Sequence, residues 1–227
     1  MKGKKVISCI LILSILFCAV AITVTALSSD HNIFRQAGQF FRTALNGMAS
    51  NVTQNNEVVA KYNGMPITVT AVEYNKSMNI LRDEESAAER DTDIEVINKI
   101  IESMILQEEA ERLGLSATDA EIEGMVSSAV EAYSLPQGKE MIDPFLDGAG
   151  ITFDEYIVLL REQAPRVIAR QKLIDEIGKQ YCKQNGLEFT KINPPAELIA
   201  AQKAFIEQLF EQNKNKIEYF INNPVLE

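Results

Sequence analysis

The feature that most constrains the fold of this 227-residue chain is a repeated Thr-x-x-Glu pattern. It occurs four times, each time before apolar residues at helical spacing, as Thr70 with Glu73, Thr92 with Glu95, Thr118 with Glu121, and Thr152 with Glu155. In this capping box the threonine hydroxyl accepts a hydrogen bond from an early helix N–H, and the glutamate reaches back to the threonine N–H. Four such starts predict a mainly α-helical domain.

A short β-hairpin is predicted just before the first of these helices. Residues 58–62 and 65–69 are rich in apolar side chains, and Asn63-Gly64 separates them. This dipeptide suits a two-residue turn, because both of its residues must take positive φ.

Apolar spacing predicts how the later helices extend. The helix after Thr118 carries an apolar stripe made of Ile122, Val126, Ala129, Val130 and Tyr133. Beyond Pro136 only a short helical piece is expected, near Phe145. A long helix then covers residues 153–181.

A last helix is predicted near the C-terminus. Asn193 is its expected N-cap, and Pro194 fits the first helical position, where the missing N–H costs nothing. Its apolar stripe continues through Phe220 and Ile221, so we expect the helix to run to about residue 223.

An uncharged, largely apolar run over residues 6–27 decides the expected compartment. At ~1.5 Å per residue it is about long enough to cross a ~30 Å hydrocarbon layer. Three lysines precede it, which predicts an N-terminus inside the cell and everything from residue 28 onward outside the cytoplasm. The length favours a retained membrane anchor, and the alternative is a signal peptide cleaved near Ala26, which would release the body.

Residues 31–50 predict an amphipathic helix directly after this run. Its apolar stripe contains Ile33, Phe34, Ala37, Phe40, Phe41, Ala44, Leu45 and Met48. Its polar side carries Arg35 and Arg42 and no acid. Two interpretations fit equally: the helix lies on the outer membrane surface, or it packs on the main domain.

Composition excludes several classes of function. From residue 28 onward the chain holds 19 basic and 32 acidic residues, a net charge of −13, which argues against a nucleic-acid partner. His31 is the only histidine, Cys182 is the only cysteine after the apolar run, and no phosphate-binding loop occurs. We therefore expect no catalytic residue, no metal and no cofactor.

Several segments together resemble a known family. They are residues 58–64 (VVAKYNG), 97–110 (INKIIESMILQEEA), 113–122 (LGLSATDAEI), 153–156 (FDEY) and 161–163 (REQ). In this order they resemble the N-terminal chaperone domain of SurA-type proteins over roughly residues 57–181.

The resemblance implies a fold and a function. The fold would be a mainly α bundle of the SurA N-terminal type, with a short N-terminal β-hairpin and a long C-terminal helix, preceded by one transmembrane or signal helix. The function would be an extracytoplasmic, ATP-independent chaperone that binds unfolded or extended polypeptide. The alternative is a dedicated protein–protein interaction module of an envelope assembly.

SurA- and PrsA-type proteins generally carry a parvulin prolyl-isomerase domain between the chaperone helices and a C-terminal helix. Here only about nine residues, 184–192, separate the corresponding helices, so that domain has no room there. Prolyl-isomerase activity is therefore the least favoured function, and the chain is predicted not to be an enzyme.

These arguments divide the chain into successive parts. They are an anchor or signal (1–27), a juxtamembrane helix and linker (28–56), the chaperone domain (57–182), a connector (183–193) and a C-terminal helix packed on the domain (194–223).

Candidate peptide-binding residues are apolar side chains suited to varied partners. Methionine is flexible and polarisable, and aromatic rings supply large contact areas. The candidates are Met78, Met125, Tyr133, Met141, Phe145, Phe153 and Tyr156. The competing interpretation is that most of them fill the core, as Met104 on a strongly apolar stripe should.

Overall fold

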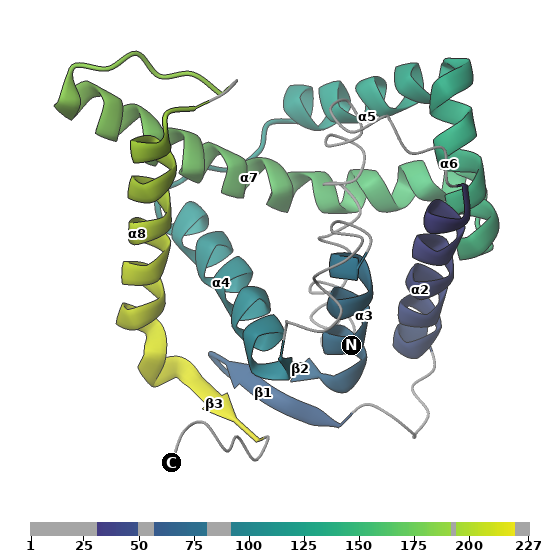
Figure 1. Ribbon diagram of the computed structural model, residues 1–227, viewed down its shortest axis with the longest axis horizontal. Helices are drawn as coiled ribbons and strands as arrows, with labels where there is room; N and C mark the ends of the chain where they lie inside the picture. The colour runs from purple at the N-terminus through teal and green to yellow at the C-terminus, as the bar shows by residue number, and fades with distance from the viewer. Residues whose placement is uncertain (1–30, 50–56, 81–91, 192–193, 221–227) are drawn as a thin grey trace.

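The computed structural model describes residues 31–49, 57–80, 92–191 and 194–220 and is mainly helical with one small sheet (Figure 1). Its elements are α2 (His31–Ala49), β1 (Val58–Tyr62), β2 (Met65–Thr68), α3 (Val69–Ile80), α4 (Asp93–Arg112), α5 (Asp119–Ser134), α6 (Pro136–Ala149), α7 (Phe153–Asn185), α8 (Ala196–Asn213), the 3-10 turn η3 (Lys214–Lys216) and β3 (Ile217–Tyr219). The predicted helical fold class with a β-hairpin is confirmed. Residues 6–27, including the cleavage point near Ala26, and the linker 51–56 lie outside the described ranges. Within those ranges, no helix has the length and apolarity needed to cross a membrane.

The long helix α7 crosses the whole molecule and organises the other helices (Figure 1). Helices α4, α5 and α8 all pack against it. At one end of the molecule α2 and α6 lie together, and at the other end stands α8, with the sheet below α3 and α4 (Figure 1). At ~1.5 Å per residue, the 33 residues of α7 extend about 50 Å, so its two ends belong to different surroundings.

Three of the four predicted capping boxes are confirmed. Thr92, Thr118 and Thr152 are the N-caps of α4, α5 and α7, and in each box both hydrogen bonds are formed. The glutamate accepts from the threonine N–H at 2.7 Å in all three. These helix starts are therefore fixed by residues that are neighbours in the sequence.

The fourth predicted box, at Thr70, is wrong. Helix α3 begins one residue earlier, at Val69, and the hydroxyl of Thr68 accepts from the Ala71 N–H at 3.4 Å. The reason is that β2 ends at Thr68 and the chain turns directly from strand into helix, so Thr70 already lies in the first turn.

The box at α5 also makes a contact with a distant helix. The Glu121 carboxylate accepts from the Thr118 N–H at 2.7 Å and from the Lys172 ammonium of α7 at 2.6 Å. Lys172, followed by Thr118, holds the pKa of Glu121 at about 2, below its ordinary value of 4.5. The start of α5 is thereby attached to α7.

We expect this contact to make stability depend on pH at the acid end. A carboxylate whose pKa is lowered by folding stabilises the fold fully above its ordinary pKa, and this stabilisation is lost as pH falls from about 4.5 through about 2. In a carbon-13 NMR titration the Glu121 carboxyl should titrate near 2 in the native protein. In a Lys172→Met variant its midpoint should move up toward 4.5, and an unchanged midpoint would show that the lysine is not the cause.

The hairpin forms as predicted, and its sheet is larger than predicted. Asn63 and Gly64 take positive φ of 49° and 77°, as the turn requires. The strand order is β2-β1-β3, with β1 antiparallel to both neighbours. The third strand comes from the C-terminal end of the described chain, where the Phe220 N–H donates to the Val59 carbonyl at 2.9 Å.

The predicted extent of the last helix is therefore wrong at both ends. Helix α8 begins at Ala196 with Pro195 as its N-cap, and it ends at Asn213. Ile217, which lies within the predicted helix, instead pairs with Tyr62 of β1. Strand β1 has a second edge whose N–H and C=O groups need partners, and β3 supplies them.

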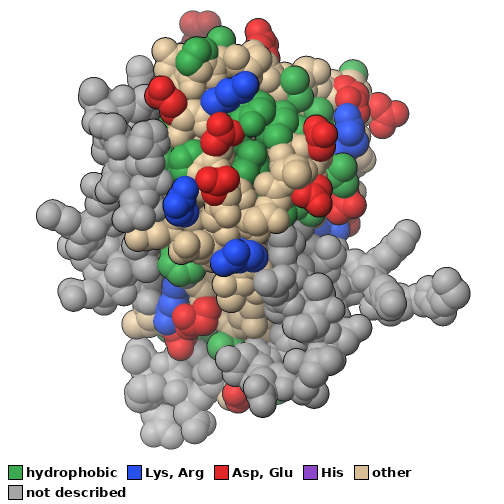
Figure 2. Space-filling view, turned by 90° about the vertical axis from the view of Figure 1, so that its right-hand side faces the viewer, with side chains coloured by type: hydrophobic (Ala, Val, Ile, Leu, Met, Phe, Trp, Pro, Cys, Tyr) green, Lys and Arg blue, Asp and Glu red, His purple; other side chains and the backbone are tan. Residues whose placement is uncertain are grey.

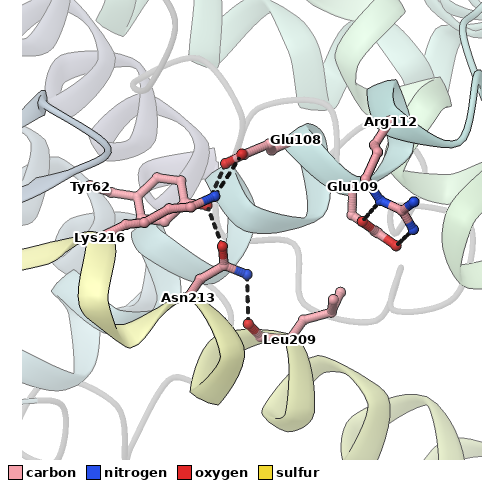
Figure 3. Close-up of polar contacts among 7 residues, drawn as sticks. All are labelled: Tyr62, Glu108, Glu109, Arg112, Leu209, Asn213 and Lys216. Atoms are coloured by element: carbon pink, nitrogen blue, oxygen red, sulfur yellow. Dashed lines mark hydrogen bonds and ion pairs between the residues drawn. The ribbon is translucent and has the colours of Figure 1, made fainter.

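A polar cluster fastens this returning segment to the body (Figure 3). The Tyr62 hydroxyl donates to one oxygen of Glu108 on α4 at 2.5 Å, and the Lys216 ammonium donates to the other oxygen at 2.9 Å. Tyr62 itself has no exposed surface. Burial, with the hydrogen bond to Glu108, raises the pKa of Tyr62 well above its ordinary value, so this hydroxyl remains a donor at every physiological pH.

Helix α6 is longer than expected and makes a very close contact with α2. It covers Pro136–Ala149, with the proline at its first turn, where a short piece near Phe145 was predicted. A Cβ built on Gly38 of α2 would lie 2.0 Å from the Phe145 carbonyl oxygen, and one on Gly148 would lie 2.1 Å from that of Arg35. The two helices therefore meet backbone to backbone.

Two residues of the apolar stripe of α2 are buried in the domain. Ala37 and Phe41 are 5% and 1% exposed, and Phe41 belongs to the main core cluster. The outward side carries Gln36 and Thr43, which are exposed. Of the two interpretations of residues 31–50, the structure favours packing on the domain.

Candidate functional site

Four of the candidate residues meet where α5, α6 and the start of α7 come together. The rings of Tyr133 and Phe153 stack, with centroids 3.8 Å apart and planes 13° apart. Phe153 lies 6.0 Å from Tyr156, which meets Phe145 edge to face at 6.2 Å. Phe41 of α2 continues the series at 5.7 Å from Phe145. We call these five residues the aromatic cluster.

The cluster is buried at its centre and half-exposed at its margin. Tyr156 is only 6% exposed and therefore supports the other rings from within the core, so its prediction as a contact residue is not supported in this conformation. Tyr133, Phe145 and Phe153 are half-buried and pack against the core. They retain surface that a partner can reach.

Tyr133 is held in place by polar contacts on α6. Its hydroxyl donates to Asp143 at 2.8 Å, and the Lys139 ammonium lies 5.5 Å from the centre of its ring. The hydrogen bond to Asp143 raises the pKa of Tyr133 above its ordinary value. The ring is therefore fixed over Phe153 and does not swing freely at the surface.

The methionines differ in how far the structure describes their burial. Met125 on α5 and Met141 on α6 are half-buried, and Met125 packs against the main core. Met104 also packs against that core, as expected. Met78 lies in α3, but its side chain is outside the described part of the structure. Of the three candidate methionines, two thus lie on the same pair of helices as the aromatic cluster.

Most of the apolar stripe of α5 is only partly buried. Val126 is the only fully buried residue of this helix, and Val130 is 46% exposed. Helix α5 packs against α7 and α6, and these two neighbours cover only part of its apolar face.

Two further exposed apolar residues near this region were not predicted. Leu135, between α5 and α6, is 53% exposed, and Val158 of α7 is 54% exposed. The only sequence signal for Val158 is its place off the stripe formed by Tyr156, Ile157 and Leu160. Viewed from the side of α2 and α6, hydrophobic side chains gather in the upper part of the face, bordered by acidic and basic ones (Figure 2).

The charge around this surface is strongly acidic. Residues 119–161 contain nine Asp and Glu and only two basic residues, Lys139 and Arg161. Arg161 is engaged with Glu123 at 3.0 Å. Among the described residues, no group of three His, Cys, Asp or Glu side chains is arranged to hold a metal ion. The arrangement offers apolar contact with an acidic border.

Comparison with known proteins gives one match. A family model described as the SurA-like N-terminal domain matches residues 5–173, which is most of the chain. This domain is a non-catalytic chaperone-type domain, and the match confirms the resemblance noted in the sequence. No curated protein and no solved structure matches the chain.

Proposed function

Because the chain belongs to the SurA-like N-terminal domain family, we propose that it is an extracytoplasmic, ATP-independent chaperone module that binds unfolded or extended polypeptide. The family supports a chaperone-like or protein-interaction function in general. The binding of unfolded chains and the location outside the cytoplasm are our proposal. The proposed chaperone function requires no catalytic step.

The observation that carries the proposal is the uncovered apolar face of α5. Val130 of α5 and Leu135 at its C-terminal end are about half exposed, and so is Val158 on α7, which packs against α5. Apolar side chains gathered at a surface with a polar border are typical of binding sites. Fixed rings next to flexible methionines suit partners of varied sequence.

The acidic border supports a preference among clients. Nine acidic against two basic residues in 119–161 attract positive charge and repel negative charge near the apolar surface. Extended apolar segments flanked by lysine or arginine are therefore the preferred clients. Their binding weakens as salt concentration rises, because these charges are exposed.

The sequence supports an orientation at the membrane. Residues 6–27 form the anchor, and the three lysines before them place the N-terminus in the cytoplasm. The helical domain then lies outside the cytoplasm, where no ATP is required for a cycle based on apolar contact. Cleavage near Ala26 would release the same domain and leave its client binding unchanged.

The direct test is suppression of aggregation. The full chain, held in detergent or nanodiscs, should suppress aggregation of several unrelated denatured proteins at near-stoichiometric ratio without ATP. Tight binding of one envelope protein without any effect on denatured clients would favour the dedicated interaction module instead. Turnover of a proline-containing peptide above background would contradict the non-catalytic function.

The surface itself is tested by a triple substitution, Val130→Gln, Leu135→Gln and Val158→Gln. All three side chains are about half exposed, so the fold should tolerate the change. Losing several buried CH₂ groups from the complex, at ~0.8 kcal/mol each, should raise the Kd for a fluorescent apolar peptide roughly tenfold or more.

A matched control uses three other exposed apolar residues, at the end of α4, in the connector and on α8. Leu113→Gln, Leu187→Gln and Ile199→Gln alter side chains that are 46%, 44% and 52% exposed. This triple variant should bind the peptide as the original chain does. Equal weakening in both variants would mean that binding is not located at α5 and α7.

A further inference from the structure

The contact between α2 and α6 has a consequence for how the domain sits at the membrane. Helix α2 follows the apolar run 6–27 with only residues 28–30 between them. A chain covers at most ~3.3–3.6 Å per residue, so the first residue of α2 lies no more than about 14 Å from Leu27. Wherever the run ends at the membrane, α2 must begin close by.

Helix α2 is joined to the domain by its backbone, so it cannot act as a loose tether. Gly38 lies against the backbone of Phe145 and Ala149, and Gly148 lies against that of Arg35 and Gln39. Phe41 is 1% exposed beneath this crossing, and Arg35 pairs with Asp147 at 3.2 Å. Because this crossing is rigid, the distance of α2 from the membrane also sets the distance of α6 from the membrane.

The exposed side of α2 suits a headgroup layer better than a hydrocarbon layer. Within residues 34–43, the part of α2 whose burial is described, the exposed residues are Arg35, Gln36, Gln39, Arg42 and Thr43, all polar or basic. The described part of this helix contains no acid, in contrast with the acidic border around α5. Basic side chains are attracted to anionic lipid headgroups, whereas an acidic surface is repelled by them.

We propose that α2 is a rigid mount that holds the domain against the headgroup layer of the bilayer, with the exposed polar side of α2 next to the lipid. The acidic α5 surface is thereby held close to the membrane without lying on it. This inference rests on the membrane anchor of the proposed function but not on client binding. The proposed partner is the lipid headgroup layer, and the test measures how close probes on the protein lie to the headgroups.

The test places single labelled cysteines in the full chain after Cys9, Cys18 and Cys182 are replaced by serine. One probe is at Gln36 on α2, and the other is at Asp147 on α6, which is exposed and pairs with Arg35 of α2 at the surface. The chain is reconstituted in vesicles of phosphatidylethanolamine and phosphatidylglycerol that carry a nitroxide on the headgroup. Both probes should be quenched severalfold more than in vesicles without nitroxide.

Breaking the crossing should separate the two probes. A Gly38→Leu substitution drives a side chain into the α6 backbone, so α6 should leave the membrane while α2 stays tethered. Quenching at position 147 should fall severalfold and quenching at position 36 should persist. The control is Gly124→Leu on α5, where nothing lies within 4 Å and both signals should remain.

A second variant keeps the fold intact, in case Gly38→Leu disturbs it. Twenty Gly and Ser residues inserted between Asp30 and His31 have a root-mean-square length of roughly 25 Å. Quenching at both positions should then drop together. Persistent quenching at position 147 in either variant would overturn the mount, while peptide binding measured on the same samples would report separately on the chaperone function.

Discussion

Replacing Tyr62 with alanine should lower the free energy of unfolding by about 3–5 kcal/mol, the loss typical of a large aromatic residue removed from a core. Its side chain has no exposed surface and lies in the main core cluster. It also holds Glu108, which in turn holds Lys216 at the start of the returning strand. The change therefore removes core packing and one attachment of the C-terminal segment together.

Urea unfolding followed by far-ultraviolet circular dichroism measures this loss, and Tyr62→Phe separates its two parts. Phenylalanine keeps the ring and lacks only the hydroxyl. The free energy of unfolding of this variant should therefore fall by only about 1 kcal/mol, because Glu108 is partly solvated and still pairs with Lys216. If both variants lost the same amount, the hydrogen bond and not the ring would dominate.

Two helical glycines should respond to alanine with opposite signs. Gly148→Ala forces a methyl group to within 2.1 Å of the Arg35 carbonyl oxygen and 3.0 Å of the Gln39 nitrogen. These are backbone atoms that move only with the whole helix, so we expect a loss of about 1–3 kcal/mol and weaker hydrogen-exchange protection in α2. Gly124→Ala, on α5 with open space around it, should gain about 0.5–1 kcal/mol.

Thermal and urea unfolding of both variants provide the comparison. Each change adds one methyl group to a helix, so the difference in sign isolates the space around the glycine. A stabilised Gly148→Ala variant would mean that α2 can move away from α6 at little cost, and the mount proposed for α2 would lose its basis.

The candidate site was partly predictable from the sequence. Aromatic residues on separate helices stood out by type, and Tyr133, Phe145, Phe153 and Tyr156 do form one cluster. Their degree of exposure was not predictable, because Tyr156 lies inside the cluster and Val130 outside the core. A helical pattern gives the direction of an apolar face but not how many neighbours cover it.

The sequence by itself determined the features that are completed within a few residues. The starts of α4, α5 and α7 follow from Thr92, Thr118 and Thr152, because each capping box satisfies its hydrogen bonds within four residues. The turn at Asn63-Gly64 follows likewise from the φ values that these two residues accept.

Only the tertiary structure decided where the chain changes its local preference. The pattern that predicted a helix to residue 223 gave way at Asn213, because β1, some 150 residues earlier, offers an unpaired edge that β3 completes. In the same way, the sequence of α2 allowed its apolar face to lie on lipid. In the structure the helix packs against α6 instead, because Gly148 lets the two backbones meet. Burial and strand pairing depend on residues that are distant in the sequence, so the local sequence pattern does not predict them.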